Sequence, residues 1–170
     1  MRTNFLTFLI LVSVLVFVSA SWAIKDAALV LYLPFEEGVG DVAMDQSGHG
    51  IKAALKGAEW SKEGKFGGCI HLTDTAYVEI DPIPELDITD RITMEAWIFP
   101  EQSQGDSNVM GRRSPDNTGG YCMQWSAQFT GSPMIETWLN INGWQGTRQR
   151  QSKAPELKTW HHVASTYDGA

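Results

Sequence analysis

The strongest potential for chemistry lies in the acidic side chains of the segment Glu79-Ile80-Asp81-Pro82-Ile83-Pro84-Glu85. A pair of carboxyl groups that flanks a glycosidic bond can hydrolyse it, with one group acting as nucleophile or base and the other as acid. Because alternate residues of a strand share a face, Glu79 and Asp81 would project together. However, Pro82 and Pro84 cannot donate to a β ladder, so they end the strand that would present the carboxylates. We therefore predict a strand end followed by a proline-rich loop, with no catalytic residue.

A second polar segment, Asp45-Gln46-Ser47-Gly48-His49-Gly50, combines side-chain oxygens with two glycines. The side chains of Asp45 and Ser47 are suited to accept hydrogen bonds from nearby backbone amides. Gly48 and Gly50 permit left-handed backbone conformations. The pattern predicts a compact turn between early strands.

A tryptophan among polar and glycine residues marks the segment 140–148, which we predict to be a loop. Sugars present apolar C–H faces that stack on aromatic rings, while amides and charged groups satisfy their hydroxyls. A glycan platform here would use Trp144 as the stacking ring and Asn142, Gln145 and Arg148 as polar contacts. The alternative is a loop tryptophan folded back on the edge of the protein. Four other tryptophans lie in strand-like runs and are predicted to be core residues: Trp60, Trp97, Trp138 and Trp160.

The cysteines and histidines offer little catalytic chemistry. Cys69 and Cys122 form an even pair, for which we favour a disulfide in an oxidising compartment, although each also fits a buried free thiol. His161 and His162 are adjacent on a predicted strand, so their side chains point to opposite faces and cannot share a metal ion.

The first 23 residues are typical of a signal peptide. Arg2 precedes an apolar run over 5–18, and small residues before Ala23 suit cleavage after that position. The run is shorter than the roughly 20 residues needed to span a bilayer. We expect residues 24–170 to form one domain that is secreted, extracellular or periplasmic, without membrane insertion after cleavage.

The charge of the chain limits its partners. The formal net charge is −7, so phosphate backbones and anionic lipids are repelled, and we predict no nucleic-acid partner. Such a surface also tolerates acidic clusters around a hard cation such as calcium. Simple solubility explains the same composition.

The elements that position these residues are predicted to be short strands. After residue 23 the chain shows apolar or alternating runs separated by turn residues, and it has no convincing long helix. The clearest period-two pattern covers 92–99. We expect strands at 28–35, 53–60, 69–72, 76–80, 92–99, 121–129, 135–141 and from Trp160 onward, with a surface loop over 101–119 interrupted by Val109-Met110. Many short strands at this spacing favour an antiparallel sandwich of two sheets.

Several blocks in order also resemble a known family. They are Leu31–Gly38 (L-Y-L-P-F-E-E-G), the 45–50 turn, Gly64–Gly68, Tyr77–Ile80, Leu86–Thr89, Thr93–Ile98 and the ending Trp160–Gly169 (W-H-H-V-A-S-T-Y-D-G). Together they resemble laminin-G-like (LamG-like) jelly-roll domains of the concanavalin A-like lectin/glucanase superfamily, over most of residues 28–170. The resemblance implies an all-β antiparallel jelly-roll sandwich. The family's return strand after the Asp168-Gly169 turn is missing, so we expect the domain to be incomplete at its C-terminus.

The resemblance implies a function as well. Similar domains often bind calcium beside the 45–50 turn, where Asp45, Ser47 and the carbonyl of His49 would supply some of the ligands. The fold also includes glycosidases with an E-x-D-x-E or E-x-D-x-x-E strand, but here the spacing from Asp81 to Glu85 is longer than in either motif, by one residue relative to the longer one. We therefore expect a non-catalytic module that recognises extracellular or cell-surface glycan or protein, with calcium as a candidate structural ion. The alternatives are a glycoside hydrolase that uses Glu79 and Asp81, and a structural spacer in a larger surface protein.

Overall fold

The computed structural model describes residues 26–73, 75–102, 106–113, 119–126, 134–140, 144–148 and 155–169. In this part of the chain nearly all regular structure is β, as predicted, and every strand pairing is antiparallel. No helix within these ranges is long and apolar enough to cross a membrane. The predicted signal peptide, residues 1–23, lies outside the described residues.

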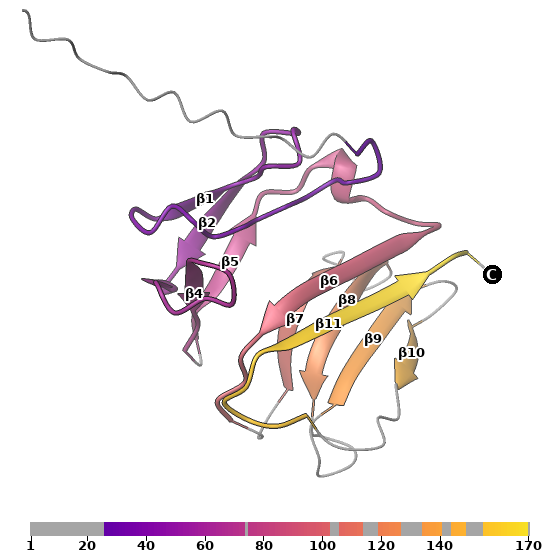
Figure 1. Ribbon diagram of the computed structural model, residues 1–170. Coiled ribbons are helices and arrows are strands. Elements are labelled where there is room, and N and C mark those ends of the chain that lie inside the picture. The colour runs from indigo at the N-terminus through magenta and orange to yellow at the C-terminus, as the bar shows by residue number, and fades with distance from the viewer. Residues whose placement is uncertain are drawn as a thin grey trace, which may run out of the picture.

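The N-terminal part contains two small sheets, drawn in indigo and magenta in Figure 1. The first has the order β1 (Val42–Met44), β2 (Lys52–Lys56) and β5 (Tyr77–Ile80). The second is a hairpin of β3 (Glu59–Ser61) and β4 (Cys69–His71). Alternation along β2 buries Ala53 and Leu55, which pack with Ala43, Trp60 and Ile70 in one apolar cluster.

The C-terminal part is a sandwich of two sheets. One sheet has the order β10 (Trp144–Arg148), β9 (Met134–Asn140), β8 (Gly120–Ser126) and β7 (Asp106–Arg113). The other pairs β6 (Ile92–Ile98) with β11 (His161–Tyr167), which lie in front of the larger sheet in Figure 1.

The facing sides of these two sheets form the larger core. Its buried members come from four strands, and they are Met94, Tyr121, Met123, Trp125, Ile135 and Val163. A polar contact also joins the sheets, because the Thr137 hydroxyl donates a hydrogen bond to Ser165 Oγ at 2.7 Å. The outer face of the β6–β11 sheet therefore carries the alternate positions, 93, 95 and 97 on β6 and 162, 164 and 166 on β11.

Four predicted elements differ in the structure. The strand predicted over 53–60 is divided into β2 and β3, which belong to different sheets, and Gly57 between them has a φ of 72°. Residues 28–35 form no strand, because their backbone bonds to the following turn: the Tyr32 N–H donates to Asp45 Oδ1, and the Tyr32 carbonyl accepts from Gln46 N–H. The predicted loop over 101–119 contains β7, whose register shifts between Asn108 and Met110. The predicted loop over 140–148 contains β10, which continues the sheet at the edge of β9.

Two of the sequence blocks that carry the family resemblance dock against each other. The Gly68 N–H donates to Glu36 Oε2 at 2.9 Å, and a Cβ at Gly67 would collide with the same carboxylate. Phe35, just before, has a φ of 57°, and its ring lies 6.4 Å from that of Trp60. The Glu36 carboxylate could move away from such a Cβ, but Gly67 also has a φ of 149°, which residues with a side chain rarely adopt. A Cβ at Gly68 would collide with the Phe35 backbone carbonyl, so both glycines of this pair have a physical reason.

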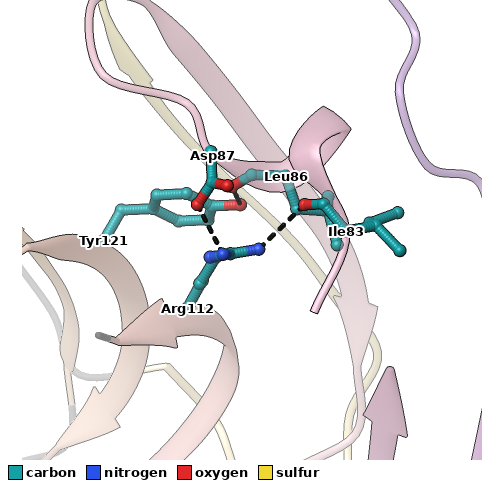
Figure 2. A network of polar contacts seen from close by, with 5 residues as sticks. All are labelled: Ile83, Leu86, Asp87, Arg112 and Tyr121. Atoms are coloured by element: carbon teal, nitrogen blue, oxygen red, sulfur yellow. Dashed lines mark hydrogen bonds and ion pairs between the residues drawn. The ribbon is translucent and has the colours of Figure 1, made fainter. Parts of the chain in front are cut away.

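A polar network fastens the segment between β5 and β6 to the large sheet. This segment contains the 3₁₀ turn η1 (Pro84–Leu86). Figure 2 shows the Arg112 guanidinium between the Asp87 carboxylate, with which it forms an ion pair, and the Ile83 carbonyl, to which it donates at 3.0 Å. The Tyr121 hydroxyl donates to the Leu86 carbonyl at 3.1 Å. Burial raises the pKa of Tyr121 above its ordinary value, so this hydroxyl keeps its proton and remains a donor.

Candidate functional site

The carboxylates of the proline-containing segment are placed as the sequence predicts for a strand end. β5 ends at Ile80 and η1 begins at Pro84, so Asp81 lies beyond the strand. Glu79 Oε2 lies 3.7 Å from Lys56 Nζ on the neighbouring strand, and both side chains are about half exposed. Neither acid lines the cavity of about 90 Å³ at the end of the sandwich, whose walls include Ile88, Tyr121 and Tyr167.

The 45–50 segment forms the predicted turn. Asp45 Oδ1 accepts hydrogen bonds from the backbone N–H groups of Tyr32 at 2.9 Å and Ser47 at 2.8 Å, and Oδ2 accepts the Ser47 hydroxyl at 2.7 Å. Gly48 and Gly50 have positive φ angles of 106° and 70°, as expected. Burial acts to raise the pKa of Asp45, but these hydrogen bonds to the carboxylate outweigh it, and the pKa falls below its ordinary value of 3.8.

The same bonds bear on the fit of a calcium ion. Both lone pairs of Asp45 Oδ1 face amide donors, and Oδ2 has one lone pair left, because it accepts the proton that the Ser47 hydroxyl donates. A calcium ion needs about six to eight oxygens, and within the described ranges no group of three or more acidic, histidine or cysteine side chains is placed to hold a metal. The residues present fit a closed turn better than a metal centre. Calcium at Asp45, Ser47 and His49 stays a prediction.

Three of the residues predicted as a glycan platform, Trp144, Gln145 and Arg148, belong to β10. Trp144 pairs with Asn140, Gln145 with Leu139, and Arg148 with Glu136. These three positions belong to a strand and not to the predicted loop. Asn142 lies outside the described residues. Binding through the four residues stays a prediction.

The predicted disulfide is not present in the structure. Cys69 and Cys122 are free cysteines, and they belong to separate sheets, since Cys69 is in β4 and Cys122 in β8. Cys122 is buried, and its Sγ accepts a hydrogen bond from the Arg113 guanidinium at 3.6 Å. The strand-like apolar surroundings of both residues agree with the free thiols in the structure, and the disulfide inferred from an even count is not shown.

A surface that the sequence did not reveal lies on the outer face of the β6–β11 sheet. Trp97, predicted to be a core residue, is 41% exposed there, and its ring centroid lies 5.2 Å from that of His162 on the paired strand. Phe99, also 41% exposed, lies 5.5 Å from Trp160. Phe66, from the β3–β4 connection, meets the Trp97 ring edge-on at 5.4 Å and is 76% exposed. We call these five residues the aromatic strip: Phe66, Trp97, Phe99, Trp160 and His162.

Charged groups flank the aromatic strip. Lys65 Nζ lies 4.9 Å from the centroid of the Trp97 ring, which is within the range of a cation–π contact. Glu95 Oε2 lies 3.5 Å from His162 Nε2, and both side chains are well exposed. His161, on the opposite face as predicted, contacts the Glu156 carbonyl through Nε2 at 2.7 Å. The face thus combines apolar rings with a cation, a carboxylate and an imidazole.

Comparison with known proteins places the chain in a family. Residues 72–170, more than half of the chain, match a laminin G family model described as "Concanavalin A-like lectin/glucanases superfamily". No curated protein and no solved structure matches. The matched range includes β5 to β11, and thus the whole two-sheet sandwich and all of the aromatic strip except Phe66. This laminin-G-like chain belongs to the concanavalin A-like lectin/glucanases superfamily.

Proposed function

We propose that this protein is an exported, non-catalytic recognition module that binds glycan outside the cell or in the periplasm through the outer face of its β6–β11 sheet. The observation that carries the proposal is the Trp97 ring, which is 41% exposed on an open sheet face with Lys65, Glu95 and His162 beside it. The family includes lectins, which supports the class of ligand.

The chemistry of this face suits a sugar. The C–H face of a pyranose packs on an aromatic ring, and its hydroxyl groups need donors and acceptors at the edge of that ring. Lys65 offers a charged donor, Glu95 an acceptor, and His162 one of each. A residue buried in the core could not serve, so the exposure of Trp97 is essential to the argument.

Binding is favoured over hydrolysis on the geometry of the acids. Paired catalytic carboxylates stand about 5–10 Å apart on either side of a bound sugar. Here Glu79 is engaged by Lys56, and Asp81 lies past the end of β5. The glycosidase alternative predicts release of reducing sugar from a polysaccharide, lost in Glu79→Gln. The spacer alternative predicts no ligand at all.

A glycan array tests the proposal. We expect the wild-type protein to bind at least one carbohydrate and Trp97→Leu, which keeps apolar bulk but removes the ring, to lose that signal. Tyr77→Leu is the matched control, because Tyr77 is 52% exposed on β5, away from the strip. Loss of binding in Trp144→Leu and not in Trp97→Leu would move the site to β10. An array without signal, together with capture of a purified extracellular protein, would replace glycan by a protein partner.

A further inference from the structure

The aromatic strip has a direction, and this direction bears on the kind of glycan. Trp97 and His162 are cross-strand partners in the β6–β11 register, and Phe99 and Trp160, each two residues from one of them, lie just beyond the adjacent ends of β6 and β11. Two residues of a strand span about 7 Å, so the two ring pairs follow each other along the sheet at about that interval. Phe66 extends the row beside Trp97.

Exposed ring surface is present at both positions of this row. Trp97 and Phe99 are exposed to the same extent, 41%, and Phe66 is more exposed still, at 76%. The rings lie on a sheet face, whereas pockets that enclose a small ligand have volumes of about 300–1,000 Å³. The cavity at the end of the sandwich has about 90 Å³ and is lined by other residues.

These features favour one class of ligand. A single terminal sugar is held best by an enclosing pocket, whereas a row of rings on an open face gives each successive unit of an extended chain its own stacking contact. Tethered contacts of this kind add affinity with each unit that reaches a further ring. The net charge of −7 disfavours polyanionic chains. Building on the proposed function, we infer that the aromatic strip binds internal units of a linear, uncharged polysaccharide.

The inference makes a specific statement about the two ring pairs. A short oligosaccharide reaches one pair, and a longer one reaches both. Removing the ring of Phe99 therefore weakens the binding of long chains and leaves the shortest chains that bind at Trp97 unaffected. Removing the ring of Trp97 weakens the binding of both short and long chains, because Phe66 and Lys65 also contact that ring.

The test is titration calorimetry with cello-, xylo- and manno-oligosaccharides of two to six units, using wild type, Trp97→Leu, Phe99→Leu and the control Tyr77→Leu. We expect affinity for at least one series to rise with chain length. Each lost stacking contact should lower the affinity for the hexasaccharide by about three- to tenfold, while Tyr77→Leu leaves it unchanged. Melting curves of each variant verify that it is folded.

Other outcomes separate this inference from the proposed function. Affinity that is independent of chain length, or equal losses for short and long chains in Phe99→Leu, would overturn the linear-chain assignment while glycan binding stands. The same holds if the glycan array reports only terminal, branched or anionic sugars and no neutral hexasaccharide binds. If neither the array nor any oligosaccharide gives binding, both the inference and the proposed function fail.

Discussion

The network around Arg112 allows the attachment of the 81–91 segment to the sandwich to be measured. Arg112→Met keeps most of the side-chain volume and removes both polar contacts, the ion pair with Asp87 and the hydrogen bond to the Ile83 carbonyl. The Asp87 side chain is 60% exposed, so the ion pair contributes about 0.5–1 kcal/mol. The bond from a charged donor to the carbonyl adds roughly 1.5 kcal/mol, the lower end of the range for charged groups, because the Arg112 side chain is 27% exposed. Arg112→Met should therefore destabilise the protein by about 2 kcal/mol.

The assay is denaturant unfolding of the wild type, Arg112→Met, Asp87→Asn and the double variant. We expect Asp87→Asn to cost about 0.5–1 kcal/mol, because it leaves the carbonyl bond intact. The double variant should cost little more than Arg112→Met alone, since the two residues share the ion pair. A loss of about 2 kcal/mol corresponds to roughly 4–8 °C in melting temperature. Additive losses in the double variant, or a neutral Arg112→Met, would refute the account of this network.

Three further predictions concern the turn and the cysteines. Because hydrogen bonds lower the pKa of Asp45 in the folded protein, the stabilisation by its carboxylate is fully present above the ordinary pKa of 3.8 and is lost as pH falls through the lower folded value. Asp45→Asn should therefore cost about 1–3 kcal/mol at pH 7 and make the stability of the protein less dependent on pH in that acid range. An unchanged dependence of stability on pH would contradict this. The melting temperature tests the calcium predicted at this turn, because a rise on adding calcium that Asp45→Asn abolishes would establish the metal site, whereas an unchanged value would rule it out. Cys69 and Cys122 should both react with a thiol reagent in denatured, non-reduced protein, whereas two unreactive cysteines would show that they form a disulfide.

Alternation along the sequence predicted the central strands well. Residues 92–98 show the period-two pattern, whereas the residues from Trp160 onward were predicted from their β-branched and aromatic residue types, and both segments form strands as predicted. The segment 28–35 has the same composition, yet its backbone groups bond to the Asp45 turn, a long-range pairing that composition does not encode. β7 and β10 were missed because their residues are polar or glycine-rich, and cross-strand pairing outweighs local propensity there.

The candidate site was harder to predict than the fold. Alternation places Trp97 on the face of β6 opposite Met94, together with Thr93 and Glu95, but a large aromatic residue in a strand is typical of a core, so Trp97 was predicted to be a core residue. The cross-strand contact with His162 and the contributions of Lys65 and Phe66 depend on the pairing of β6 with β11 and on the course of the β3–β4 connection. The Asp45 turn was predicted correctly, because the Asp45–Ser47 bonds and the positive φ angles of Gly48 and Gly50 depend on neighbouring residues.

The measurement that tests the central claim most directly is a nitrogen–proton NMR titration that follows the tryptophan indole signals during addition of a glycan identified on the array. The signals of Trp97 and Trp144 are assigned by their absence in Trp97→Leu and Trp144→Leu. Binding at the aromatic strip predicts that the Trp97 indole signal shifts in proportion to saturation while that of Trp144 stays in place. A shift of Trp144 alone, or of neither, would contradict glycan recognition by the outer face of the β6–β11 sheet.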